Sequence, residues 1–321
     1  MALQRIAGSA DKVLASAIPL LMKPMGMGVY NAHRLFSRIN KAGNKKEWEG
    51  ESLQGAVVTS TYGKAASYAN DDPVNTTGVE PFTAVQWELG GYQVSVNIPG
   101  MKIRKVQTSA QKVYNLAESE IKLAMHDMMD LMSVHLFQST NDAKGLISLD
   151  TITDASTALG GLAASSAWGG TTTASGPFAS QGKADLMTLF MTLSKYQGWD
   201  LKPGDQFDGP DLHVTRSTEW QLYWASLEGS MRYTAGGKGD VLLETMFMGQ
   251  PIVLDEHLIS GRWYQLRTSD LSLYVMPDAD FELLPETRAT TQPDMFSRAA
   301  IWNGQIVSRS RRMNGKLTGL S

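Results

Sequence analysis

The sequence predicts an α+β fold, and three observations support this prediction. Between residues 85 and 98, apolar and polar residues alternate with a period of two, which is typical of strands. From about residue 106 to 138 the chain has no Gly or Pro, and apolar residues recur every three or four positions, which is typical of a helix. From residue 248 onward, short β-prone runs alternate with turn residues. The 321 residues, 42% of them hydrophobic, suffice for a sizeable core.

Composition excludes several classes of protein. The chain has no cysteine, so it forms neither disulfides nor thiolate metal sites. No run approaches the ~20 apolar residues of a membrane helix. The apolar stretch "LASAIPLLM" near the N-terminus is short, contains Pro19 and lacks a cleavage pattern, so we expect neither secretion nor membrane insertion.

Charge is distributed unevenly along the chain. Residues 1–46 contain eight Lys or Arg and one Asp, and residues 295–321 contain five Lys or Arg and no acidic residue, whereas the whole chain carries −3. The middle is therefore acidic. Two interpretations remain open: the basic ends face an acidic partner or the acidic body of a neighbouring copy, or they are ordinary solvated tails. The low charged content, 19%, suggests that protein contacts cover much of the surface.

The first predicted elements are an arm and a hairpin. Residues 1–46 read as amphipathic pieces separated by "MKPMGMG", too few to bury a core of their own. The β-prone runs "AVVTSTY" and "AVQWELGGYQVSVNI" flank the polar stretch "NDDPVNTTG", which predicts an extended hairpin. Gly90 and Gly91 interrupt the alternation, as at a bulge or bend.

The next element is a helix of about 30 residues, which would span roughly 45–50 Å. Such a length is typical of a beam along an extended molecule rather than of a helix in a compact domain. We predict that its buried face consists of Val113, Ala117, Ile121, Ala124, Met128, Leu131 and His135.

After this helix we predict a long loop, because residues 151–182 are rich in Ala, Gly, Ser and Thr and carry Trp168. The run "KADLMTLFMTLSKY" predicts a second helix and "DLHVT" a buried strand. A third helix, "STEWQLYWASLE", begins with Ser217 or Thr218 as its N-cap. The stretch "YTAGGKGDV" reads as an exposed loop.

The stretch "IKLAMHDMMD" offers the main candidate for chemistry, since His126 and Asp130 lie one helical turn apart, as two metal ligands would. Both, however, fall opposite the apolar stripe, where a solvated face is expected. A metal site also needs further ligands, and the other four histidines follow no ligand spacing: His33, His135, His213 and His257.

Two other motifs are weak. The run "GGKGD" at residues 236–240 lacks the glycine spacing and following helix of a phosphate loop. The run "RSRRM" suits phosphate contacts, or Arg309 and Arg311 form one charged face of a sheet. The sequence therefore offers no catalytic, cofactor-binding or metal-binding residues, and we expect a protein that is not an enzyme and needs no cofactor.

The order of these parts resembles the major capsid protein of tailed bacteriophages, which has the Hong Kong 97 fold. Five stretches are similar to that family over essentially the whole chain: "GLISL" after the long helix, "DLHVTRSTEWQLYWASLE", "FMGQPIVLDE", "LYVMPDADFEL" and the ending "AAIWNGQIVSRSRRMNGKLTGL".

The resemblance implies a division of the chain into five parts: an N-terminal arm over 1–47, an E-loop hairpin over 48–105, a peripheral (P) domain with its spine helix over 106–182, an axial (A) domain over 183–283, and C-terminal strands over 284–321 that return to the P domain.

It also implies a structural protein that self-assembles into hexamers and pentamers of an icosahedral head enclosing double-stranded DNA. The expected partners are copies of itself, a portal protein, a decoration protein in some heads, and a separate scaffolding protein, because the arm leads almost directly into the hairpin. The expected location is the virion, with assembly in the host cytoplasm and no membrane contact. Lys64, Asn303 and Asn314 suit a Lys-to-Asn cross-link in position only, so cross-linking stays open.

Three rival hypotheses remain. An encapsulin nanocompartment shares the fold and encloses cargo enzymes instead of DNA. From other classes, a β-rich adhesin or tail component suits the Gly/Ser/Thr loops, and a metal hydrolase suits the His126 cluster. Within the capsid hypothesis, we expect His126 to act as a pH-sensitive contact during assembly rather than as a ligand.

Overall fold

The computed structural model describes most of the chain: residues 34–41, 43–58, 82–106, 109–165, 168–195, 209–228, 246–284 and 295–321, with single positions 14, 16, 20, 21, 67, 78 and 80. Three predicted features lie outside the described residues. They are most of the N-terminal arm, most of the hairpin tip with Lys64, and the 229–245 loop with "GGKGD".

The described elements confirm a mixed α+β fold. The helices are α2 (Arg34–Lys41), α3 (Gly100–Val106), α4 (Ala110–Phe137), α5 (Leu149–Ile152), α6 (Lys183–Lys195) and α7 (Ser217–Glu228). The strands are β1 (Lys45–Glu47), β2 (Leu53–Val58), β3 (Phe82–Trp87), β4 (Gly90–Pro99), β5 (Thr171–Ala174), β6 (Leu212–Thr215), β7 (Met246–Phe247), β8 (Gln250–Leu254), β9 (Arg262–Leu266), β10 (Leu271–Leu283), β11 (Met295–Ser308) and β12 (Gly315–Thr318).

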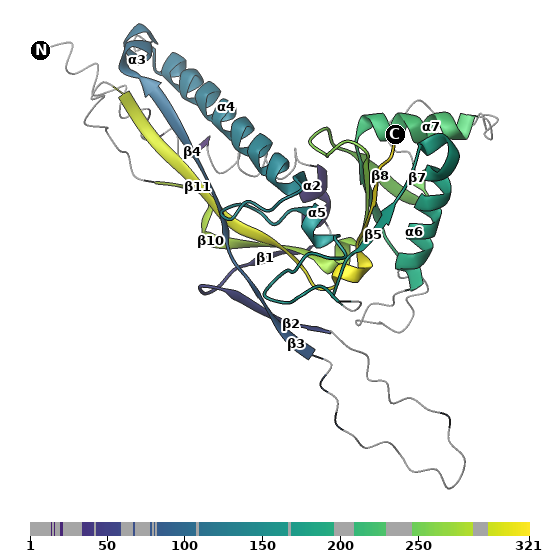
Figure 1. Cartoon of the computed structure of the whole chain (residues 1–321). Coiled ribbons are helices and arrows are strands. Elements are labelled where there is room, and N and C mark those ends of the chain that lie inside the picture. Colours follow the sequence, from purple (N-terminus) through teal and green to yellow (C-terminus); the bar gives the residue numbers. More distant parts are fainter. Residues whose placement is uncertain are drawn as a thin grey trace, which may run out of the picture.

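An elongated body consists of a four-stranded sheet in the order β1-β10-β11-β4, with α4 lying along it (Figure 1). The predicted alternation in β4 is confirmed, because Tyr92, Val96 and Ile98 are buried and Val94 packs partly buried against the same core. The C-terminal third had suggested only short strands, whereas β10 and β11 have 13 and 14 residues. Register shifts between Val275 and Glu282 let β10 continue past the irregular sequence around Pro277.

The long helix is confirmed with 28 residues, about 42 Å at 1.5 Å per residue. Its predicted buried face holds from Val113 to Met128 and then turns. Leu131 is 45% exposed, while Met132, Leu136 and Phe137 are buried. The reason is that this end of α4 meets a second lobe, where the rings of Phe137 and Tyr264 lie 6.4 Å apart, so a different side of the helix is covered.

The second lobe is a six-stranded sheet in the order β5-β12-β9-β6-β8-β7, with α6 and α7 packed against it (Figure 1). The predicted helices and the buried strand of "DLHVT" are confirmed as α6, α7 and β6. Side chains from both helices and the sheet form a separate core: Phe178, Leu186, Leu189, Phe190, Leu193, Tyr223, Phe247, Ile252, Trp263, Leu317 and Leu320.

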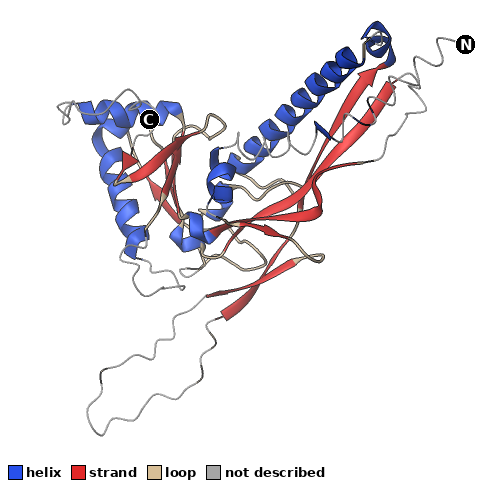
Figure 2. Ribbon diagram, turned by 180° about the vertical axis from the view of Figure 1, so that it is seen from behind, coloured by secondary structure: helices blue, strands red, loops and turns tan. Residues whose placement is uncertain are grey.

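The predicted hairpin is confirmed in part. Strands β2 and β3 pair antiparallel and form a separate two-stranded sheet that projects from the body (Figure 2). The run "AVQWELGGYQVSVNI", however, divides at the double glycine. Its first half is β3 of the hairpin, and its second half is β4, which pairs with β11 in the body. The bend expected at Gly90 and Gly91 therefore marks the passage from one sheet to another.

The sheets cross the sequence divisions suggested above. Within 1–47, α2 buries Leu35, Phe36 and Ile39 in the main core, and β1 pairs with β10, so this part of the arm belongs to the body. Strand β10, from the 183–283 segment, lies in the body, whereas β12, from the last segment, lies in the second lobe. The two lobes are therefore joined by several passages of the chain.

Candidate functional site

The projecting hairpin is anchored to the body at its base. Trp87, at the end of β3, is buried and packs edge-on against Trp168, with ring centroids 6.2 Å apart. The backbone N–H of Gln86 donates to the carbonyl of Gly160 at 3.1 Å. Gly160 has φ +63°, and a Cβ there would lie 2.0 Å from Val85 Cγ1, so only glycine fits. The stem is thus fixed, although a two-stranded sheet is marginal in water by itself.

The turn after α4 is locked to the start of β4. The backbone N–H of Leu146 donates to Tyr92 Oη at 2.9 Å, and Tyr92 Oη lies 3.0 Å from His135 Nδ1. Burial raises the pKa of the Tyr92 phenol well above its ordinary value. The phenol therefore stays protonated, and its contact with Nδ1 makes His135 a fixed partner of β4 instead of a member of the apolar face.

Close backbone approach completes this lock. A Cβ on Gly90 would lie 2.5 Å from the carbonyl oxygen of Gly145, so the two segments touch only because residue 90 has no side chain. Gln305 of β11 accepts from the N–H of Ile147 at 2.7 Å and donates to the carbonyl of Glu88 at 3.0 Å. The hairpin base, the helix end and β11 thus form one rigid junction.

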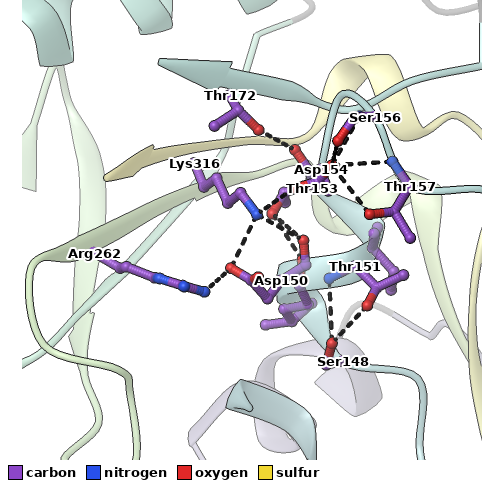
Figure 3. Close-up of polar contacts among 12 residues, drawn as sticks. Ser148, Asp150, Thr151, Thr153, Asp154, Ser156, Thr157, Thr172, Arg262 and Lys316 are labelled. Atoms are coloured by element: carbon purple, nitrogen blue, oxygen red, sulfur yellow. Dashed lines mark hydrogen bonds and ion pairs between the residues drawn. The ribbon is translucent and has the colours of Figure 1, made fainter. Parts of the chain in front are cut away.

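A buried polar cluster connects the body to the second lobe (Figure 3). Asp150 of α5 pairs with Arg262 of β9, and its Oδ1 accepts from Tyr264 Oη at 3.1 Å. Lys316 of β12, only 3% exposed at its side chain, places Nζ 3.1 Å from Asp150 Oδ1 and 2.9 Å from Asp154 Oδ2. We name these five residues the buried cluster. Its charges come from α5, the segment that follows it and two strands of the six-stranded sheet.

Electrostatics keep the Asp154 carboxylate of this cluster ionised. Burial by itself would raise the pKa of Asp154, but hydrogen bonds from Lys316 and Ser156 outweigh it and hold that pKa far below its usual range. A buried charge is stable only when it is paired and hydrogen-bonded, and each charged member of the cluster has at least one opposite partner. The cluster is therefore a structural ion-pair network.

Arg311 is fully buried, which overturns the interpretation that "RSRRM" presents it to phosphates. Its guanidinium lies 5.7 Å from the ring centre of Trp168, and burial lowers its pKa to about 10, which still leaves it charged at neutral pH. It donates to the carbonyl oxygens of Thr151, Ile152, Asp154, Thr157 and Trp168.

These contacts also revise two other predictions. The 151–182 segment is not a structureless loop, because it contains part of α5, strand β5 and a π-helical turn at Phe178–Gly182. It also contains the carbonyl oxygens that accept hydrogen bonds from Arg311. The basic C-terminal segment does not face a neighbouring copy through Lys316 or Arg311, because both are buried within their own chain.

The histidines are dispersed. His126 and Asp127 are exposed on α4, and Asp130 contacts His257 rather than His126, with Oδ1 2.7 Å from Nε2. His213 is buried among aromatic rings, and burial lowers its pKa to about 3. Within the described ranges, no group of three or more His, Asp or Glu side chains is arranged to hold a metal ion.

Large apolar side chains are exposed on both lobes. On α4, Leu123, Leu131 and Val134 are 61%, 45% and 43% exposed and lie on one side of the helix. On α6, Met187 and Met191 are exposed one turn apart. Exposed apolar groups that cluster on helices are typical of surfaces that contact other chains.

The sequence could not have revealed these junctions, because their partners lie far apart along the chain. Lys316 and Asp150, for example, are separated by 166 positions. The one local signal is a charged residue inside a short β-prone run, as Lys316 is in "NGKLTGL". In the part of the chain that the structure describes, no helix is long and apolar enough to cross a membrane.

Comparison with known proteins identifies the fold. No protein-family model and no curated protein sequence matches the chain. Among solved structures, the chain is similar to the capsid asymmetric unit of cyanophage A-1(L), with a TM-score of 0.61 and 10% identity over 86% of this chain and 90% of that one. It is also similar to the capsid of a native GTA particle, with a TM-score of 0.59 and 11% identity over 88% and 90% of the two chains.

A third similar structure is the holo-SrpI encapsulin complex from Synechococcus elongatus PCC 7942, with a TM-score of 0.50 and 10% identity over 87% and 85% of the two chains. At these identities the likeness establishes the fold. The chain has the Hong Kong 97 fold, as its sequence predicts.

Proposed function

We propose that the chain is the major structural protein of a tailed-phage head, which self-assembles into hexamers and pentamers of an icosahedral shell around double-stranded DNA. The observation that carries this proposal is a fold shared over 86% of the chain with a phage capsid protein, together with a hairpin that projects away from its own body. We assign no enzymatic activity to the chain.

The architecture suits assembly by interlocking. The β2–β3 stem forms a sheet separate from the other two, and Val57, Val85 and Trp87 are buried against its own body. We infer that an adjacent subunit covers its remaining face, as expected of an E-loop. The six-stranded lobe corresponds to the A domain at the capsomer centre, and the body with α4 to the P domain at the junctions between capsomers. Residues before α2 would extend along another subunit, except that Leu14 is buried in the core of its own chain and Leu21 packs against that core.

The junctions explain how such a subunit keeps its shape. Contacts repeated by symmetry close into a shell only if each subunit presents its contact surfaces in a defined arrangement. The Tyr92–His135 lock and the buried cluster both hold the lobes and the hairpin base in one arrangement. In this role the protein would be located in the virion, assemble in the host cytoplasm, and meet a portal, a scaffolding protein and, in some heads, a decoration protein.

An encapsulin shell is the second candidate, and the similarity to the SrpI encapsulin favours it. The TM-score is higher for the cyanophage capsid, 0.61 against 0.50. The charge argument for DNA now rests mainly on the N-terminal segment, because Arg311 and Lys316 are internal. Nuclease-protected DNA inside the particles supports the phage head, whereas protected cargo enzymes without DNA support the encapsulin.

The experiment is an assembly assay with two variants. The full chain, co-expressed with the scaffolding protein of the same phage, should sediment as shells that electron microscopy resolves. A variant in which a short Gly-Ser turn replaces residues 59–81 should remain a folded monomer or capsomer and form no shell. A variant lacking residues 1–33, which spares α2 and β1, tests the arm in the same way.

The outcomes are distinct. Finding only monomers or small trimers of the full chain would contradict the capsid proposal. Normal shells from the hairpin variant would contradict the role assigned to the hairpin, and normal shells without residues 1–33 would contradict that of the arm. Circular dichroism of each variant excludes misfolding as the cause of lost assembly.

A further inference from the structure

A histidine on the turn between β8 and β9 connects the second lobe to the exposed side of α4. His257 Nε2 lies 2.7 Å from Asp130 Oδ1 on α4, and His257 Nδ1 lies 3.0 Å from Asp255 Oδ1 on its own turn. Asp130 and His257 are 127 positions apart in sequence. One imidazole ring therefore bridges two carboxylates that belong to different parts of the molecule.

The chemistry of this arrangement depends on protonation. A carboxylate only accepts hydrogen bonds, and a neutral imidazole donates through one nitrogen, whereas an imidazolium donates through both. His257 can consequently satisfy Asp130 and Asp255 at the same time only when its ring is positively charged. With one proton lost, one of the two contacts sets a nitrogen lone pair against a carboxylate oxygen.

The structure indicates which contact would fail. Asp255 is held in place, because its Oδ1 also accepts the backbone N–H of His257 at 3.0 Å and its own N–H donates to the carbonyl of Thr215 at 3.0 Å. Its side chain is 11% exposed, whereas that of Asp130 is 54% exposed. The remaining N–H would stay with Asp255, and Asp130 would turn into solvent.

We propose that His257 is a pH-sensitive latch, which holds the β8–β9 turn on α4 while its imidazole is charged and releases α4 when the ring loses a proton. Two carboxylates face it, Asp130 from α4 and Asp255 from its own turn. The adjacent Glu256 is engaged by Arg216, with Oε2 3.2 Å from Nε.

The direction of the effect follows from electrostatics. Partial burial would lower the pKa of His257, but the hydrogen bonds and negative charges of Asp130 and Asp255 outweigh it and raise that pKa above 6.5. A raised pKa in the folded state means that the stabilisation is complete below the unfolded value and is lost as the pH rises through the folded one. The latch is therefore closed in mild acid and opens toward alkaline pH.

This proposal is separate from the expectation that His126 acts as a pH-sensitive contact during assembly, which stays a prediction. His126 is exposed on α4, and no hydrogen bond or ion pair joins it to any other described residue. The residue of this stretch that contributes to the proposed latch is Asp130, whose partner comes from another part of the chain.

The test uses nuclear magnetic resonance titration of the histidine rings in the full, unassembled chain. His257 should titrate above 6.5, and Asp130→Asn should lower its pKa toward or below 6.5. Asp127→Asn is the matched control, because it removes the same charge from an exposed position of the same helix, and it should leave His257 nearly unchanged. His126→Gln identifies the His126 signal and should also leave His257 unchanged.

A second readout separates a latch from a local contact. The difference in urea midpoint between the wild type and Asp130→Asn should be measurable at pH 6 and vanish at pH 9, while Asp127→Asn shows no such dependence. A wild-type His257 pKa at or below 6.5, an unchanged pKa in Asp130→Asn, or an equal urea difference at both pH values would overturn the proposal. None of these outcomes depends on whether shells form.

Discussion

Two charged clusters join the second lobe to the rest of the molecule, and they differ in burial and in the kind of cation they use. The buried cluster relies on the ion pairs of Lys316 and Arg262 with Asp150. The latch relies on His257, which is 31% exposed at its side chain and changes its charge near neutral pH. One connection is thus permanent and the other conditional.

The difference shows how one subunit can be both rigid and adjustable. The buried cluster lies at α5, where the chain leaves the long helix, and it fixes the position of the six-stranded sheet there. The latch contacts α4 at Asp130, two turns before the end of the helix and on its exposed side. Opening it would loosen the helix against the β8–β9 turn without separating the lobes.

The largest expected effect comes from removing one partner of the buried cluster. Lys316→Met leaves Asp150 and Asp154 without their shared cation in a site where Lys316 is only 3% exposed. Removing one partner of a buried ion pair typically costs about 3–5 kcal/mol. We expect Lys316→Met to lower the free energy of unfolding by a similar amount. Chemical denaturation measures it.

The control is Lys122→Met, which removes an exposed partner of Glu118 on α4 with a 2.7 Å contact. Exposed pairs four residues apart contribute about 0.3–0.5 kcal/mol. Equal losses for the two variants would mean that the buried cluster is no more important than a surface ion pair.

A smaller loss is expected from Arg311→Lys. The ammonium of Lys keeps the charge but cannot match the planar fork that reaches five carbonyl oxygens, so several of these would remain unpaired. The expected cost is about 1–3 kcal/mol. Arg309→Lys, at an exposed neighbouring position, should change stability by less than about 0.5 kcal/mol. A loss in Arg309→Lys as large as in Arg311→Lys would contradict the internal role of Arg311.

The smallest effects are those of pH, and they have opposite directions in the two clusters. Because the pKa of Asp154 is lowered, its contribution is present above about pH 4 and is lost as the pH falls further. Because the pKa of His257 is raised, its contribution is lost as the pH rises.

Each variant should therefore remove one side of the profile of stability against pH. Asp154→Asn should flatten the acid side and His257→Gln the alkaline side, the latter by about 1 kcal/mol or less because the site is partly exposed. Urea midpoints measured from pH 3 to pH 9 decide this. If His257→Gln altered only the acid side, the assignment of the two clusters would be wrong.

Much of the fold could be predicted because its signals are local. An uninterrupted 3.6-residue period predicted α4, and a period of two predicted β3 and β4. The face of α4 near Leu131 was mispredicted, because the second lobe covers that end from another direction. The role of Arg311 was missed for a similar reason: its partners lie in a segment whose composition suggests a loop. Contacts more than a hundred positions apart leave no periodic trace in a single sequence.

The most direct test of the proposed assembly is a cryo-electron microscopy reconstruction of the particles that the full chain forms. We predict a closed icosahedral shell of hexamers and pentamers, in which the β2–β3 hairpin of each subunit lies on an adjacent subunit and the six-stranded lobes meet at the capsomer centre. Open aggregates or small oligomers, or shells in which each hairpin rests on its own subunit, would contradict it.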